Sequence, residues 1–462
     1  MKGFTMERLL ASLDIDTGSY NSTLIDADIA GITTDSRSVG RDEVFFAIDG
    51  ENFNGADYAL SALGSGAQCA VVNEVERSRF DGEQRFVFVD DTVTALGDVA
   101  SGYRSQFKGT VVGVTGTSGK TTVKEMLRAV LGTTYSVHCT RGNFNNQIGL
   151  PLSVFGIDDS HGCAVLEMGM SASGEIACLA GITRPEIGVV LNVGPAHLEF
   201  FESVEQIADA KMELAEAIDE SGTVVLNGDD KRIRDREEGC TANIIRFGIN
   251  GEWDYRAENI VMHSDGCASF DIEGNTVRLR IPGRHNVYNA LAAFAVGRIM
   301  DVDGKKAADA LGQVSAPSMR MEKIEHDGVI YINDSYNANP LSMKAAADVL
   351  EHTAVAEGGR KIAVLGDMRE LGPISDEAHR DVGRLFASIG INLLFAVGES
   401  AGLYAEGAIE RGISTETVRT FSSVDEARTS LENEKRRGDV IFIKGSRALG
   451  LERIINGEKE SN

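Results

Sequence analysis

The stretch VVGVTGTSGKTTVKEML, from Val111 to Leu127, decides the fold of this chain. The apolar segment Val111 to Val114 is typical of a buried strand, and a glycine-rich turn and then a helical segment follow it. Glycines let the backbone wrap a phosphate chain, and the N-terminus of the following helix favours negative charge. This order predicts a nucleoside triphosphate site made by Gly116, Thr117, Ser118, Gly119, Lys120, Thr121 and Thr122.

Two side chains of this loop have predicted roles. Lys120 would reach the β- and γ-phosphates, and the Thr121 hydroxyl would bind Mg²⁺. The spacing departs from strict GxxxxGK[ST], because Val114 stands where the first glycine is expected. The alternative is a plain glycine-rich turn. A GTPase is excluded because the chain has no Asn-Lys-x-Asp motif.

Further apolar strands alternate with helical segments on both sides of this loop. GCAVLEMGM, EIGVVLNVG and GTVVLNGDD follow it, and VIYINDS, KIAVLGDM, NLLFAVG and DVIFIKGS form a later group. Alternating strands and helices predict largely parallel sheets. We therefore expect an α/β fold of three domains: a small N-terminal α/β domain (1–108), a central P-loop parallel-sheet domain (109–314) and a C-terminal Rossmann-like domain (315–462).

The charge balance excludes some partners. Lys and Arg number 45 against 70 Asp and Glu, a net charge of −25, which repels nucleic acid and anionic membranes. The six cysteines show no CxxC spacing, and no apolar run is long enough for a signal peptide or a membrane span. We expect a cytoplasmic monomer without nucleic-acid partners or membrane insertion, and a disordered tail NGEKESN at the C-terminus.

Two polar residues near strand ends are candidate metal ligands. Glu167 interrupts the apolar segment CAVLEMGM, and His197 follows the strand GVVLNVG. Together with Thr121 they would converge at one edge of the sheet, where a carboxylate and an imidazole suit Mg²⁺ or, better for the histidine, Mn²⁺. The alternative is that each is an ordinary solvated or hydrogen-bonded polar residue.

Lys211 lies in the predicted helix EQIADAKMELAEAID, from Glu205 to Asp219, on the apolar stripe between Ile207 and Leu214. Lysine is almost never fully buried without a partner. A desolvated, neutral lysine can add CO₂ and become a carbamate, which is an anionic metal ligand. The alternative is a lysine whose stem is buried and whose ammonium reaches solvent.

Six motifs in order resemble the Mur ligases, the ATP-dependent amide ligases that build the peptidoglycan stem peptide. They are TGTSGKTT, TRGNFNNQIGLPLS, LEMGMSASGEI, NVGPAHLEFF with ADAKMEL, PGRHNVYNALAAFAV and INDSYNANPLSM. The pair DSYNANP and VLGDMRELG is similar to the last-acting member, which joins D-alanyl-D-alanine to UDP-N-acetylmuramoyl-tripeptide (UDP-MurNAc-tripeptide). The resemblance implies that reaction, through an acyl phosphate and with release of ADP and phosphate.

The resemblance also implies roles for individual residues. Lys211 would be the carbamylated lysine, and Glu167 and His197 would be magnesium-site residues. Lys120, Lys211, His197 and Arg320 would be catalytic. The remaining implied contacts are Asn289 near the adenine, Arg320 and Asp334 on ATP, Asn146 on the nucleotide-sugar peptide, and Ser36 and Arg37 in the uridine nucleotide pocket of the first domain.

Two departures from the family pattern lie on the substrate side. The chain reads Asn54-Gly55-Ala56 where Asp-Gly-His is frequent, and Gln147 where an acidic residue is common. These concern fine substrate contacts more than the class of reaction. The alternatives are a sister ligase that adds another amino acid or uses another carboxylate, and a P-loop switch or binding protein without ligase activity.

Overall fold

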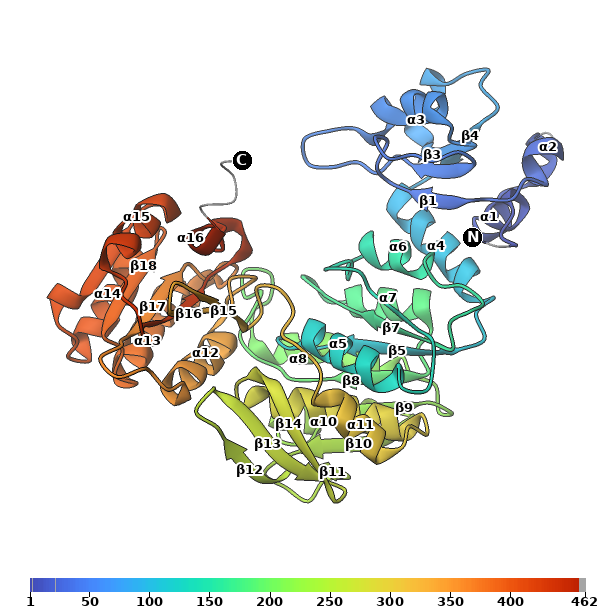
Figure 1. The fold of residues 1–462 in the computed structure, drawn as a ribbon. Helices are drawn as coiled ribbons and strands as arrows, with labels where there is room; N and C mark the ends of the chain where they lie inside the picture. Colours follow the sequence, from blue (N-terminus) through green and yellow to red (C-terminus); the bar gives the residue numbers. More distant parts are fainter. Residues whose placement is uncertain (2, 21, 457–462) are drawn as a thin grey trace.

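A seven-stranded, entirely parallel sheet forms the centre of the computed structural model, which describes residues 1, 3–20 and 22–456 (Figure 1). Its strand order is β11-β10-β9-β8-β5-β7-β6. Sheets of this kind are buried on both faces, and β5, β7, β8 and β9 are accordingly runs of apolar residues. The strands are β5 (Thr110–Thr115), β6 (Val137–Cys139), β7 (Cys163–Glu167), β8 (Ile187–Val190), β9 (Thr223–Asn227), β10 (Asn243–Gly248) and β11 (Tyr255–Arg256).

Helices cover both faces of this sheet because successive strand residues point to opposite sides. Val112 and Val114 belong to one core, with helices α5 (Lys120–Leu131), α10 (His285–Ile299) and α11 (Gly304–Leu311). Val111 belongs to the other core, with helices α4 (Thr92–Arg104), α6 (Gly149–Val154), α7 (Glu175–Thr183) and α8 (Val204–Glu216). The short helix α9 (Lys231–Arg234) follows β9.

The first domain contains a four-stranded parallel sheet of order β1-β2-β3-β4. Its strands are β1 (Gly31–Thr33), β2 (Glu43–Phe46), β3 (Cys69–Asn73) and β4 (Phe86–Val89), and its helices are α1 (Met6–Ser12), α2 (Ser22–Ile25) and α3 (Ala59–Ser65). Helix α4 leads from this domain to β5, and its apolar side chains share the core that covers the central sheet. The first domain is thereby anchored to the central one.

The third domain is built on a six-stranded sheet of order β15-β16-β20-β17-β18-β19, in which only the β15–β16 pair is antiparallel. The strands are β15 (Glu322–His326), β16 (Val329–Asn333), β17 (Lys361–Gly366), β18 (Leu393–Val397), β19 (Val418–Phe421) and β20 (Val440–Lys444). Helices α12 (Pro340–His352), α13 (Ser375–Ser388) and α14 (Ala401–Glu410) share one core, and α15 (Val424–Glu434) and α16 (Arg453–Asn456) the other.

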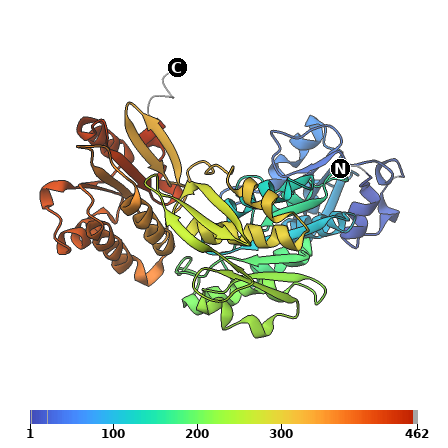
Figure 2. The ribbon, with the colours of Figure 1, turned by 60° about the horizontal axis from the view of Figure 1, so that its bottom comes forward.

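The expected α/β class with three domains is confirmed, and Figures 1 and 2 show the central domain between the other two. A three-stranded antiparallel sheet of β12 (Glu258–Met262), β13 (Cys267–Ile272) and β14 (Asn275–Pro282) was not expected from the sequence. Among the described residues, no helix is long and apolar enough to cross a membrane. Apart from Asn456, which ends α16, the tail expected to be disordered lies outside the described residues.

Candidate active site

A cavity of about 960 Å³ opens at the carboxyl edge of the central sheet, where the third domain meets it. Ligands of parallel α/β sheets bind at this edge, and the volume is typical of small-molecule sites. Strands β7 and β8 flank β5, so that Glu167 at the end of β7 and the segment after β8 lie on either side of the loop after β5. The sheet order therefore assembles the site.

The loop from Gly116 to Lys120 has the backbone conformation that phosphate wrapping requires. Gly119 has a φ of 89°, and a Cβ there would lie 2.6 Å from Asn289 Oδ1, so only glycine fits. Helix α5 begins at Lys120, which aims its N-terminus at the cavity. The Lys120 ammonium donates to the Gly116 carbonyl at 2.7 Å, and desolvation lowers the pKa of Lys120.

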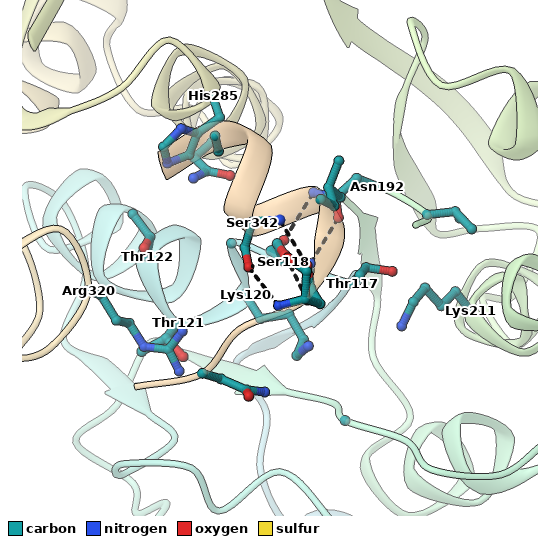
Figure 3. A pocket seen from close by; sticks show the side chains of 18 of the residues that line it. Thr117, Ser118, Lys120, Thr121, Thr122, Asn192, Lys211, His285, Arg320 and Ser342 are labelled. Carbon is teal, nitrogen blue, oxygen red and sulfur yellow. Dashed lines mark hydrogen bonds between the residues drawn. The ribbon is translucent and has the colours of Figure 1, made fainter. Parts of the chain in front are cut away.

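Asn192, which the sequence analysis did not identify, clamps this loop. Its side-chain oxygen accepts from the Ser118 N–H at 2.9 Å, and its amide group donates to the Ser118 carbonyl at 3.0 Å. Thr117 adds a backbone bond to the Asn192 carbonyl at 3.0 Å. Figure 3 shows Asn192 beside the loop, with dashed lines in this region. Its position just after β8 was the signal available in the sequence.

Thr121 and Glu167 are in direct contact. The Thr121 hydroxyl donates to Glu167 Oε2 at 2.9 Å, and Asn145 Nδ2 donates to Oε1 at 2.8 Å. Glu167 ends its strand instead of interrupting it, and it is buried. A hydroxyl and a carboxylate side by side fit a hard divalent cation, which prefers oxygen ligands.

The four predicted metal ligands share the cavity wall, but among them only Thr121 and Glu167 have a described contact with each other. Glu167, Thr121, His197 and Lys211 all line the cavity. Within the described part of the chain, no group of three or more His, Cys, Asp or Glu side chains is arranged to hold a metal. The donor set thus fits a cation at the Thr121–Glu167 pair, with two further donors in the same wall.

Lys211 is only 2% exposed, so the alternative in which its ammonium reaches solvent is wrong. Helix α8 packs on β8, and its apolar face carries Lys211 to the edge of the sheet. Among the described residues, no hydrogen bond or ion pair engages its amine. Burial, with the nearby charge of Lys120 in second place, lowers the pKa of Lys211 well below its usual range. Figure 3 shows Lys211 and Arg320 on opposite sides of the phosphate loop.

His197 faces a residue of the third domain. Its Nδ1 lies 2.5 Å from Glu370 Oε2, and this hydrogen bond lowers the pKa of Glu370. Glu370 also lines the cavity, although the sequence analysis did not single it out. The motif VLGDMRELG contained it and was the available signal.

The third domain also contributes the predicted residues Arg320 and Asp334. The Arg320 guanidinium stacks on the Tyr336 ring at 3.9 Å from its centre. Asp334 Oδ2 accepts from the Lys444 ammonium at 2.5 Å, and Lys444 is a further cavity residue missed by the sequence analysis. All three charged groups lie in the wall that faces the phosphate loop.

The remaining predicted residues divide into two groups. Asn289 donates to Asn286 Oδ1 at 2.8 Å, and Asn146 accepts from the Gly149 N–H at 2.8 Å; both line the cavity. Ser36 and Arg37 lie on the exposed loop between β1 and β2 and do not line it. Arg37 forms a two-pronged bond with Asp35, both contacts at 2.8 Å.

Known proteins resemble this chain in all the regions that contribute residues to the site. Three family models match: "Mur ligase family, catalytic domain" at residues 28–104, "Mur ligase middle domain" at 114–297, and "Mur ligase, glutamate ligase domain" at 319–447. The chain is 36% identical to the UDP-N-acetylmuramoyl-tripeptide–D-alanyl-D-alanine ligase of Bacillus subtilis, over 94% of each chain. It is 32% identical to the Escherichia coli protein of the same name, over 96% of this chain and 97% of the other.

Solved structures agree with the sequence matches. The crystal structure of MurF from Acinetobacter baumannii superposes with a TM-score of 0.88, at 30% identity and over 99% of both chains. MurF ligase from Thermotoga maritima in complex with ADP superposes with a TM-score of 0.81, at 31% identity, over 92% of this chain and 96% of the other. The likeness therefore includes all three domains and their arrangement.

Proposed function

This chain belongs to the Mur ligase family, and we propose that it joins D-alanyl-D-alanine to UDP-MurNAc-tripeptide with ATP, in the synthesis of peptidoglycan precursors. The observation that carries this function is one cavity lined by the phosphate loop and Lys211 on one side and by Arg320 and Asp334 on the other. It agrees with the named relatives, which match over nearly their whole length.

The chemistry explains why cations line this cavity. A carboxylate in water forms no amide until it has a better leaving group, and ATP supplies one. The tripeptide carboxylate attacks the γ-phosphorus, ADP departs and an acyl phosphate forms. The amine of D-alanyl-D-alanine then attacks the acyl carbon, loses a proton and displaces phosphate. Two anions must approach each other in the first step, so charge neutralisation is the main catalytic task.

We assign this task to Lys120 and Arg320, which carry their charges to the cavity from two domains. Backbone N–H groups of the loop and the N-terminus of α5 would hold the phosphates. Asn289 would lie near the adenine and Asp334 beside the nucleotide. Asn146 would contact the peptide of the nucleotide sugar. Ser36 and Arg37, outside the cavity, are proposed for the uridine nucleotide in the first domain.

A divalent cation, Mg²⁺ or Mn²⁺, would be held by Thr121, Glu167, His197 and Lys211, and it would supply further positive charge to the phosphates. We propose that Lys211 takes part as a carbamate. Its neutral amine would attack CO₂, a nitrogen–carbon bond would form and one proton would leave. Deep burial and the absence of a described partner support this proposal, because both favour the uncharged amine that the reaction needs.

We propose domain boundaries at residues 108/109 and 314/315, with UDP-sugar binding in the first domain and ATP binding in the second. We also place the reaction in the cytoplasm, where ATP is available. The proposed working unit is a monomer, because a single chain supplies the cavity walls described above.

Phosphate release from ATP tests this function. With UDP-MurNAc-tripeptide and D-alanyl-D-alanine both present, we expect release together with a new amide product identified by mass spectrometry. Omitting either substrate stops product formation. Single amino acids offered instead of D-alanyl-D-alanine test for a sister ligase, and equal turnover with one of them would contradict the proposed acceptor. ATP turnover without any substrate would favour a P-loop switch.

A further inference from the structure

Two loops from different domains meet beside the cavity. Residues 197–199 follow β8 in the central domain, and residues 369–372 follow β17 in the third domain. The Glu199 N–H donates to the Glu370 carbonyl at 3.3 Å. Gly372 has a φ of 53°, and a Cβ there would lie 2.6 Å from the Leu198 carbonyl oxygen. The backbones thus approach as closely as glycine allows.

The side-chain contact at this junction is between His197 and Glu370. Nδ1 of the imidazole lies 2.5 Å from Oε2 of the carboxylate, and both residues line the cavity. Both have left-handed backbone conformations, with φ of 58° for His197 and 61° for Glu370. Such conformations are uncommon for residues other than glycine and cluster at functional sites. Both residues of the contact therefore have a left-handed backbone conformation.

We propose that Glu370 is a positioning residue that acts across the domain boundary and selects the reactive tautomer of His197. Its carboxylate accepts a hydrogen bond from the Nδ1–H group, so the proton stays on Nδ1 and Nε2 keeps the free lone pair. The hydrogen bond at one imidazole nitrogen decides the protonation of the other. The inference rests on the proposed function, because His197 is one of the donors assigned to the cavity.

This contact would make the site depend on domain docking. A histidine that binds a metal usually donates its other ring N–H to a carboxylate, which orients the ring. Here that carboxylate comes from the third domain, which also carries Arg320 and Asp334. When the third domain docks on the central domain, it therefore places the nucleotide contacts in the cavity and fixes the imidazole tautomer at the same time. An ordinary exposed ion pair would instead add little stability and change nothing else.

Nitrogen-15 NMR of the histidine rings reads the tautomer directly. The full-length protein is labelled at histidine and saturated with a non-hydrolysable ATP analogue and UDP-MurNAc-tripeptide, and the His197 signals are identified by their loss in His197→Gln. We expect neutral His197 protonated at Nδ1. Glu370→Ala shifts it to the Nε2-protonated form that free imidazole side chains favour. Glu370→Gln preserves the Nδ1 proton, because the amide carbonyl also accepts a hydrogen bond.

Two further variants separate positioning from general damage. Glu199→Ala removes an exposed carboxylate from the same junction, and its spectrum should match the wild type. Gly372→Ala retains both side chains but forces the loops apart, so the Nδ1 signature should be lost. Protonation at Nε2 in the wild type, or an unchanged His197 spectrum in Glu370→Ala, would overturn the proposal.

Kinetics provide the second measurement. We expect Glu370→Ala to lower kcat about 10- to 100-fold, as outer-shell partners of ligating residues do, with little change in KM for ATP. Glu370→Gln should recover most of the loss, and Glu199→Ala should remain within about twofold of wild type. Equal kinetics for Glu370→Ala and Glu199→Ala would contradict a positioning role. A wild-type protein without ligase activity would refute the proposed function, while the NMR result would still decide the tautomer.

Discussion

Lys211 and Lys444 are equally buried lysines in the wall of one cavity, and their surroundings differ in one respect. Each is 2% exposed. The Lys444 ammonium donates to Asp334 at 2.5 Å and to the Asn337 carbonyl at 2.8 Å. The Lys211 amine has no such partner among the described residues. Burial alone therefore does not decide what a lysine does. A partnered lysine ties two strand ends together, whereas burial without a partner lowers the pKa of the amine.

The largest effect should follow from breaking the Lys444 pair. Lys444→Met leaves the Asp334 carboxylate buried and uncompensated, which should lower the free energy of unfolding by about 3–5 kcal/mol. Urea unfolding followed by circular dichroism measures the loss. In the matched double variant Lys444→Met with Asp334→Leu, much of the stability should return. If the double variant is no more stable than the single one, the carboxylate is not the cause.

Lys211→Met should lower the ligase activity instead of the stability. We expect ligase activity to fall about 10²- to 10³-fold, the range for losing one preorganised electrostatic contact, while stability is unchanged or higher. Phosphate release and urea unfolding report the two quantities. Carbon-13 bicarbonate should give a carbamate signal in wild type and in Lys444→Met, and none in Lys211→Met. Full activity of Lys211→Met would exclude the carbamate, and rescue of Lys211→Ala by short carboxylates would support it.

The pH dependence of stability tests the environment of Lys211 further. The folded pKa of Lys211 lies well below its unfolded value of about 10.4. Between these two values the unfolded chain binds one more proton, so this group makes the free energy of unfolding rise with pH by about 1.4 kcal/mol per unit. In CO₂-free buffer, Lys211→Met should therefore gain most over wild type at the lowest pH of this window. A difference that does not change with pH would show that the amine stays protonated.

Lys124 is a third buried lysine, and its replacement should give the smallest combined effect of the three on stability and ligase activity. It is 3% exposed, and its ammonium donates to the Thr140 carbonyl at 2.8 Å, with Glu125 at 3.4 Å. Lys124→Met removes one hydrogen bond without stranding a buried charge, so we expect a loss of about 1 kcal/mol and normal ligase activity. The same unfolding and phosphate assays apply. A loss of unfolding free energy as large as that of Lys444→Met would show that the hydrogen bond from the ammonium to the Thr140 carbonyl contributes more than a single such bond normally does.

Much of the site was predictable because it depends on sequence patterns that extend over only a few residues. The phosphate loop needs closely spaced glycines between a strand and a helix, and Glu167 stands at the end of an apolar run. The structure brings both to the same sheet edge. Lys211 was noticeable as a charge on an apolar helical stripe, but the pattern alone favoured an ammonium that reaches solvent, and only the family resemblance favoured a metal-site role. Its carbamylation remains a prediction.

Asn192, Glu370 and Lys444 were missed for a common reason. Each acquires its role from a partner far away in the sequence: Ser118, His197 and Asp334, respectively. An asparagine after a strand or a glutamate in a loop is ordinary until the partner is known. The antiparallel sheet β12–β14 was also missed, although the alternation of exposed and buried residues along β14 is the pattern of an amphipathic strand.

The sequence by itself determined the alternation of strands and helices around the parallel sheets, the phosphate loop and the family, because periodicity and glycine spacing act over a few residues. Only the tertiary structure decided which buried lysine has a counter-ion and which carboxylate faces His197. Those properties depend on distances between groups that the chain brings together from up to 173 positions apart, and desolvation is felt only once the surrounding core is closed.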